Sequence, residues 1–145
     1  MLAAETKVAV PDSSGAPSEN LNCSWIQIVE HVEPFLQAVN RRLTQQAHDF
    51  DPKIVSYAQH ALNSSGKNLR PTLVALAANS IGKISDAHVT AAVIIEMVHL
   101  ATLVHDDVMD EAEIRRGKLT LAANWGNEIA VLFGDCLFAQ ALKLA

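Results

Sequence analysis

The chain has 145 residues, which suits one domain, and 50% of them are hydrophobic, which is enough for a core and argues against a disordered protein. The formal net charge of -5 argues against an extended nucleic-acid-binding surface. The two cysteines, Cys23 and Cys136, form no Cys-x-x-Cys pair, which excludes a disulfide framework and a cysteine zinc site and suits a reducing compartment.

The first 22 residues are predicted to form a mobile tail, because turn-forming and polar residues dominate positions 11–20. These residues lack the basic start and the apolar run of a signal peptide, and they contain acidic residues but no Arg, unlike a mitochondrial transit peptide. Farther along, His, Glu or Asp interrupts the apolar stretches before a membrane span is complete, so we expect none. The sequence predicts a cytoplasmic protein with one domain in residues 23–145.

A first helix is predicted from apolar residues that recur at helical spacing after Trp25. These residues are Ile28, Val32, Phe35, Leu36, Val39 and Leu43. Proline lacks a backbone N–H and is tolerated only near the start of a helix. Because of Pro34, we expect the regular part of this helix to begin near Glu33.

Two shorter helices are expected next. The first covers about residues 52–62 and ends in a loop over residues 63–66. The other runs from about Pro71 to Ser80, with proline in its first turn and Gly82 beyond its end.

The best-defined helix is expected to begin at a cap formed by Ser85 and Asp86 and to continue to about Glu113, with Gly117 ending it. A short helix over residues 119–124 follows.

The last helix is expected to begin near Glu128 and to be still running at Ala145, with no Gly or Pro to stop it. We therefore expect the chain to be a fragment. The sequence shows no β-alternation, and Ala and Leu are abundant whereas Gly and Pro number only 6 and 5. The predicted fold class is all-α.

An acidic cluster inside an apolar helix is the strongest chemical signal. Asp106 and Asp110 lie about 40° apart around a helix, and His99 falls on the same stripe. Like charges at this spacing repel, and a bound cation removes the repulsion. Carboxylate oxygens suit Mg²⁺, which takes phosphate oxygens as further ligands. The alternative is a solvated acidic helix end.

Basic residues follow this cluster and also precede it. Arg115 and Arg116 come directly after the carboxylates, which suggests phosphate held between arginine and metal, although arginine also stabilises a helix C-terminus. Lys67 and Arg70 stand where a loop enters a helix, a position that favours anions.

Together these motifs resemble the first half of a trans-isoprenyl (polyprenyl) diphosphate synthase. The matching segments are GKNLRP, EMVHLATLVHDDVMDEAEIRRG and GNEIAVLFGDCLFAQAL. The resemblance implies an all-α, isoprenoid-synthase-type helical bundle around a central cavity, of which this chain carries the N-terminal half. It also implies a prenyltransferase that condenses an allylic diphosphate with isopentenyl diphosphate, usually as a homodimer, with a heteromer as the other option.

The resemblance assigns Asp106 and Asp110 to the first aspartate-rich motif, whose carboxylates bind Mg²⁺ that bridges the allylic diphosphate. Asp107 matches the middle carboxylate of this metal motif and is expected to have a supporting role. Arg115 matches the arginine that contacts the allylic diphosphate, so Asp106, Asp110 and Arg115 are the expected catalytic residues.

The resemblance assigns Lys67, Arg70, His99 and Arg116 to the isopentenyl diphosphate site. Gly134 and Asp135 match a motif on the following helix, where a structural role is expected.

The resemblance implies that the length of the product depends on a gate at Ala101 and Thr102, the fifth and fourth positions before the first aspartate. Both residues are small, where short-chain enzymes of the family carry an aromatic side chain, so we expect a medium- to long-chain all-trans product. Thr102 should face the cavity, one turn below Asp106. Ala101 could instead be small because a neighbouring helix packs closely there.

Two alternatives remain open. Glu96 and His99 form a Glu-x-x-His motif of the kind found in di-iron bundles, but such a site needs a second copy, which the sequence lacks. The protein could also be a non-catalytic partner or regulatory subunit of a synthase. The second aspartate-rich motif of the family is absent from the chain, so we expect these 145 residues alone to be inactive.

Overall fold

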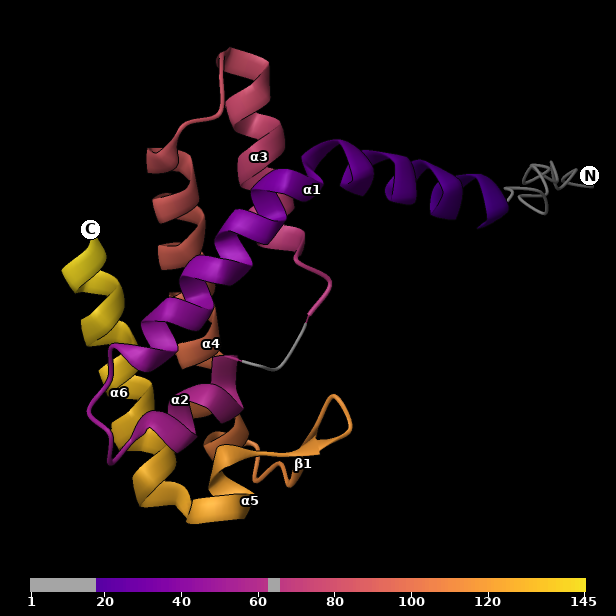
Figure 1. Cartoon of the computed structure of the whole chain (residues 1–145). Coiled ribbons are helices and arrows are strands. Elements are labelled where there is room, and N and C mark those ends of the chain that lie inside the picture. The colour runs from indigo at the N-terminus through magenta and orange to yellow at the C-terminus, as the bar shows by residue number, and fades with distance from the viewer. Residues whose placement is uncertain (1–17, 63–65) are drawn as a thin grey trace, which may run out of the picture.

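The computed structural model describes residues 18–62 and 66–145 and shows helices that pack around a central one (Figure 1). Six helices and one two-stranded hairpin occur in the described residues. In chain order they are α1 (Ser18–His48), α2 (Val55–Leu62), α3 (Leu69–Ile81), α4 (Asp86–Met109), β1 (Ile114–Arg115), β2 (Lys118–Leu119), α5 (Leu121–Trp125) and α6 (Asn127–Leu144).

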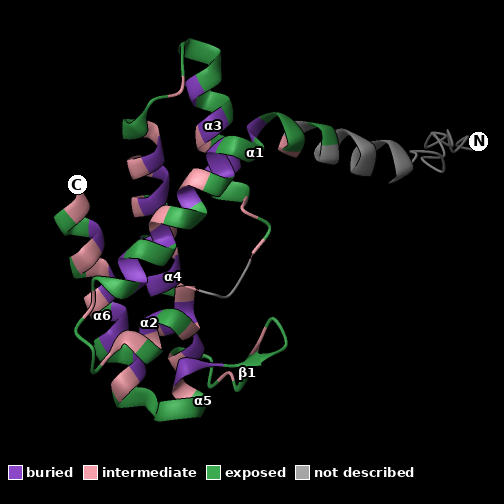
Figure 2. Ribbon diagram, viewed as in Figure 1, coloured by how far each residue is buried: buried purple, intermediate pink, exposed green. Residues whose placement is uncertain are grey.

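Helix α4 forms the centre of the core. It packs most extensively against α6 and also contacts α3 and α1. Its buried apolar residues recur at spacings of three and four, so they form one face of the helix. Among them, Val93, Met97 and Ala101 have no exposed surface. Buried residues also lie on the neighbouring helices (Figure 2), so this packing fixes which side chains of α4 face the core and which face solvent.

The start of α4 is capped as expected at Ser85. The Ser85 backbone N–H donates to Nδ1 of His88 over 2.9 Å. Arg42 of α1 forms an ion pair of 3.1 Å with Asp86 and donates to Thr90 over 2.8 Å. These contacts attach the N-terminal turn of α4 to α1.

Helix α1 begins at Ser18, so the predicted start near Glu33 is wrong. Pro34 lies inside the helix and faces solvent. Proline removes one helical hydrogen bond there. The helix continues because Val32, Phe35, Leu36 and further residues of the same face are buried against the core. Of the predicted tail, residues 1–17 lie outside the described part of the chain and residues 18–22 belong to α1.

The hairpin at residues 114–119 was not expected from the sequence. Helix α4 ends at Met109 instead of Glu113, and an antiparallel hairpin follows, pairing Ile114 with Leu119 and Arg115 with Lys118. Its turn consists of Arg116 (φ 53°) and Gly117 (φ 76°). Two central residues with positive φ are typical of a tight hairpin turn. Each strand has two residues, too few to show an alternating pattern.

Helix α4 is long and apolar enough to cross a membrane by length and composition alone. The core helix of a globular bundle meets the same criterion, and one face of α4 is buried against α1, α3 and α6.

Candidate diphosphate- and metal-binding site

Asp106 and Asp110 form an exposed pair of carboxylates at the C-terminal end of α4. Neither side chain has a hydrogen bond or ion pair with the described residues. No three His, Cys, Asp or Glu side chains converge on a possible metal site within residues 18–62 and 66–145. Mg²⁺ is commonly held by one or two carboxylates together with water and substrate phosphates, so this exposed pair fits the metal.

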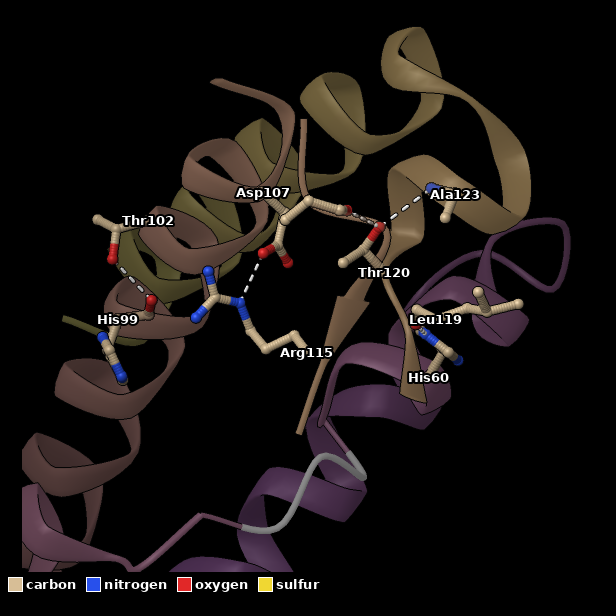
Figure 3. A network of polar contacts seen from close by, with 9 residues as sticks. His60, His99, Thr102, Asp107, Arg115, Leu119, Thr120 and Ala123 are labelled. Atoms are coloured by element: carbon tan, nitrogen blue, oxygen red, sulfur yellow. Dashed lines mark hydrogen bonds and ion pairs between the residues drawn. The ribbon is translucent and has the colours of Figure 1, made fainter. Parts of the chain in front are cut away.

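Asp107 points away from this pair and binds Arg115. Its side chain is 7% exposed, and its Oδ1 accepts a hydrogen bond of 2.6 Å from Arg115 Nε. Figure 3 shows Arg115 reaching from the hairpin to the carboxylate on the helix. One helical step of about 100° turns Asp107 toward the interior, which fits the supporting role expected for it in the metal motif.

The hairpin is fixed to the end of α4 by a second set of contacts. Thr120 Oγ1 donates to the Ala112 carbonyl over 2.7 Å and accepts from the Ala123 N–H over 3.1 Å, which caps α5. His60 Nε2 lies 2.8 Å from the Leu119 carbonyl oxygen (Figure 3). These contacts hold the hairpin against the end of α4, where Arg115 reaches Asp107.

Lys67, Arg70 and Arg116 lie together around one open pocket, although they come from the loop before α3, from α3 and from the hairpin turn. Gly66 lies directly against Arg116, since a Cβ at position 66 would be 2.6 Å from Nη1. Three of the four residues that the resemblance assigned to isopentenyl diphosphate are therefore neighbours in space. A set of cations from separate elements is suited to bind a diphosphate.

The fourth residue, His99, lies between this pocket and the exposed carboxylates. Its pKa is lowered, first by burial and then by Arg70, Arg116 and Arg115, whereas Asp106 opposes the shift. Because the charges of these arginines and of Asp106 act on it, His99 lies near both groups. At neutral pH the imidazole is therefore neutral and can donate one N–H to an anion.

Glu96 also belongs to this pocket, although the sequence did not identify it as part of the anion site. It lines the same pocket as Lys67 and Arg70. Burial raises its pKa, and Arg70 and Arg116 oppose the rise. Its position one helical turn before His99 could have indicated that Glu96 belongs to the pocket. The Glu-x-x-His motif instead suggested a di-iron site. No further ligand set for such a site occurs in the described residues.

The two predicted gate residues have different surroundings. Thr102 is exposed, and its hydroxyl donates to the His99 carbonyl over 2.7 Å. Ala101 has no exposed surface and lies one turn before His105, which faces α6. The structure thus favours close helix packing as the reason why residue 101 is small.

Gly134 allows α4 and α6 to approach each other closely. A side chain at Gly134 would overlap the imidazole of His105. That ring is held on three sides, with Nε2 lying 3.1 Å from the Val131 carbonyl oxygen and 3.5 Å from an Asp135 carboxylate oxygen and the ring against Phe138. The Gly-Asp pair has the structural contacts that its expected role requires.

We expect Gly134→Ala to lower the free energy of unfolding by about 1–3 kcal/mol, because the His105 ring cannot move without losing these contacts. Urea unfolding followed by circular dichroism measures the change. Gly82→Ala is the matched control, since a Cβ there meets no atom within 4 Å. Equal stability of the two variants would show that the α4–α6 contact is not closely packed at Gly134.

The chain is similar in sequence to known polyprenyl diphosphate synthases. A family model described as polyprenyl synthetase matches residues 51–145. Octaprenyl diphosphate synthase of Escherichia coli (strain K12) is 38% identical over 109 residues, which cover 75% of this chain and 34% of the relative. Nonaprenyl diphosphate synthase of Mycobacterium tuberculosis is 51% identical over 87 residues, 59% of this chain and 26% of the relative. The chain spans about a third of the length of these curated relatives.

Solved structures with the same fold include a decaprenyl diphosphate synthase from Rhodobacter capsulatus, with a TM-score of 0.75 and 35% identity over 83% of this chain and 37% of that one. A polyprenyl synthase from Caulobacter crescentus CB15, complexed with calcium and isoprenyl diphosphate, has a TM-score of 0.76 and 36% identity over 92% of this chain and 38% of that one. The fold is that of the isoprenoid-synthase helical bundles, which confirms the predicted fold class. With the family model matching about two thirds of its residues, the chain belongs to the polyprenyl synthetase family.

Proposed function

We propose that this protein is a prenyltransferase that condenses an allylic diphosphate with isopentenyl diphosphate to give a medium- to long-chain all-trans polyprenyl diphosphate. Mg²⁺ is the proposed cofactor, and a homodimer in the cytoplasm is the proposed state. The names of the relatives support the product class, since they include octaprenyl, nonaprenyl and heptaprenyl synthases, although one is a geranylgeranyl synthase.

The arrangement of side chains on α4 carries this proposal. The exposed residues Ile95, Val98, Thr102 and Asp106 recur at spacings of three and four, so they form one stripe. From Ile95 this stripe runs about 16 Å along α4 to the exposed carboxylates, and its two apolar side chains are followed by Thr102. Glu96 and His99 lie to one side of this stripe, toward the cationic pocket. Separate places for a metal-bound diphosphate, a second diphosphate and a hydrocarbon chain thus meet on one helix.

The first step of the proposed reaction breaks the allylic C–O bond and leaves a carbocation and a diphosphate. Mg²⁺ held by Asp106 and Asp110 would supply positive charge to the leaving diphosphate. Arg115 donates to the same diphosphate and is already oriented by Asp107, so little reorganisation is needed as charge develops.

The second step joins the two substrates. Lys67, Arg70 and Arg116 hold the diphosphate of isopentenyl diphosphate, so that its double bond can attack the allylic carbon. A proton then leaves the coupled product to form the new double bond, and the released diphosphate accepts it. The apolar stripe on α4 keeps water from the carbocation.

The direct test is a product assay with the full-length protein, because the chain spans about a third of its relatives. Isotope-labelled isopentenyl diphosphate and an allylic diphosphate are incubated with Mg²⁺, and the hydrolysed products are separated by chromatography. We expect elongated all-trans products that disappear with EDTA. A full-length protein that forms no product alone but restores activity to another synthase subunit would support the partner-subunit alternative instead.

We expect Thr102→Phe to shorten the product, because an aromatic ring on the exposed stripe would block growth along α4 one turn below Asp106. Chromatography of the hydrolysed products measures the chain length. Thr44→Phe is the matched control, since Thr44 is also exposed on a helix and its hydroxyl also donates to a backbone carbonyl of the preceding turn, that of Asn40. An unchanged product in Thr102→Phe would place the gate elsewhere.

Ala101→Phe should instead destabilise the fold by about 1–3 kcal/mol, because position 101 is completely buried.

A further inference from the structure

His60 joins helix α2 to the hairpin that carries Arg115 and Arg116. Its Nε2 lies 2.8 Å from the Leu119 carbonyl oxygen on β2 (Figure 3), so the ring donates its N–H to that oxygen. Leu119 pairs with Ile114, the residue directly before Arg115, in the register of the hairpin. One hydrogen bond from α2 therefore reaches the strand pair beside the arginine proposed to bind the leaving diphosphate.

The imidazole of His60 is itself held in place by aromatic packing. Its ring meets Trp125 of α5 edge to face, with the two centroids 5.1 Å apart. Tyr57 of α2 contacts the same Trp125 and also packs against Phe133 of α6, which is buried in the core. Aromatic pairs prefer such edge-to-face arrangements, so this packing fixes the direction in which His60 presents its N–H.

The hairpin depends on contacts with the rest of the fold, because β1 and β2 have two residues each. A two-stranded ribbon by itself is marginally stable at best in water. Arg115 contributes one contact through its side chain, which donates to Asp107 of α4 over 2.6 Å. His60 contributes another through the backbone of the paired strand. The guanidinium of Arg115 is thus oriented from two elements, α4 and α2.

We infer that His60 is a positioning residue for Arg115, because its hydrogen bond fixes the strand pair from which the guanidinium reaches the allylic diphosphate. This inference rests on the proposed function. His60 acts through Leu119 and the hairpin, so its role requires only a donor at the right place. Another side chain that brings an N–H to the same carbonyl can replace it, whereas a ring without a donor cannot.

Two substitutions separate the hydrogen bond from the aromatic packing. His60→Phe keeps a ring against Trp125 and removes the donor to the Leu119 carbonyl. His60→Gln loses the ring and keeps an N–H donor, since the amide nitrogen of glutamine reaches about as far from the backbone as Nε2 of histidine. A role in packing alone would be better preserved in His60→Phe, whereas a role as donor is better preserved in His60→Gln.

The test uses steady-state kinetics of the full-length protein with both substrates varied. We expect His60→Phe to lower kcat/KM for the allylic diphosphate about tenfold, the effect of losing one hydrogen bond, and His60→Gln to stay within about threefold of the wild type. The Mg²⁺ concentration for half-maximal rate should not change, because Asp106 and Asp110 remain intact. His31→Phe is the matched control, since exposed His31 of α1 also places a ring nitrogen 2.8 Å from a backbone carbonyl oxygen, that of Gln27.

A double-mutant cycle with Arg115→Ala gives a second readout that a purely structural role would not change. If His60 acts through Arg115, then His60→Phe should lower kcat/KM less than about twofold further once the arginine side chain is absent. A structural role apart from Arg115 would give the same loss in both backgrounds. Thermal unfolding shows whether each variant is folded at the assay temperature, and the comparison of His60→Phe with His60→Gln decides the matter if Arg115→Ala is not.

Wild-type kinetics in His60→Phe would overturn the inference while leaving the proposed function in place. A loss in His60→Gln as large as that in His60→Phe, or equal effects of His60→Phe with and without Arg115, would do the same. A wild type without condensation activity would overturn both.

Discussion

Asp106→Ala and Asp110→Ala are each expected to lower kcat by about three powers of ten or more, because each removes one of the two carboxylates proposed to hold Mg²⁺ at the leaving diphosphate. Steady-state kinetics of the full-length protein at saturating substrate measure the loss. Neither side chain has a partner in the described residues, so neither has a contact whose loss would explain such an effect.

The stability of these variants should barely change. Like charges one turn apart destabilise a helix by about 0.2–0.5 kcal/mol, so each substitution should be neutral or slightly stabilising in urea unfolding. Glu113→Gln, an exposed carboxylate beyond the pair, is the control for a general charge effect. Full activity in either aspartate variant would contradict the metal site, and a large loss of stability would show that the carboxylates have a structural role.

Arg115→Ala is expected to destabilise the protein more than Asp107→Asn does. Removal of the arginine leaves a carboxylate that is 7% exposed without its ion-pair partner, whereas removal of the aspartate charge leaves an arginine that is 36% exposed and can reach water. Breaking a fully buried pair costs about 3–5 kcal/mol, and solvent screening of the arginine reduces this to about 2 kcal/mol. We expect about 1 kcal/mol for Asp107→Asn, which retains a hydrogen-bonding side chain.

The two variants should also differ from Asp106→Ala in their use of metal. Arg115→Ala should lower kcat and raise the KM for the allylic diphosphate, and Asp107→Asn should do the same more weakly, but the Mg²⁺ concentration for half-maximal rate should stay near that of the wild type. Urea unfolding and Mg²⁺ titrations of the rate measure these effects, with Arg41→Ala on the exposed face of α1 as the control. If Asp107→Asn raised the Mg²⁺ concentration for half-maximal rate as much as Asp106→Ala does, Asp107 would be a metal ligand.

Local patterns in the sequence predicted much of this fold. The apolar spacing of α4 and the cap at Ser85 depend on interactions within a few turns of one helix, and the structure confirms both. Pro34 misled the prediction, because the burial of its neighbours outweighs one lost hydrogen bond. The hairpin at residues 114–119 was missed because its strands are too short for a pattern and because its contact with α2, between His60 and Leu119, is distant in sequence.

Only part of the candidate site could be predicted from the sequence, because local helix geometry is visible there and contacts between distant segments are not. The spacing of Asp106 and Asp110 on one face depends on helix geometry alone. The different direction of Asp107 also follows from geometry, but its ion pair with Arg115 depends on the hairpin. The approach of Gly66 to Arg116, which brings two basic segments together, joins residues 50 positions apart, and no local periodicity encodes it.

We propose that the two diphosphates bind to separate sets of groups, one dependent on metal and one on cationic side chains alone. Isothermal titration calorimetry of the full-length protein, with isopentenyl diphosphate and with an unreactive thiolodiphosphate analogue of the allylic substrate, tests it most directly. We predict that isopentenyl diphosphate binds equally with Mg²⁺ and with EDTA and loses affinity in Lys67→Ala, whereas the analogue binds only with Mg²⁺ and loses affinity in Asp106→Ala. Equal dependence of both ligands on Mg²⁺, or equal losses in both variants, would contradict the account.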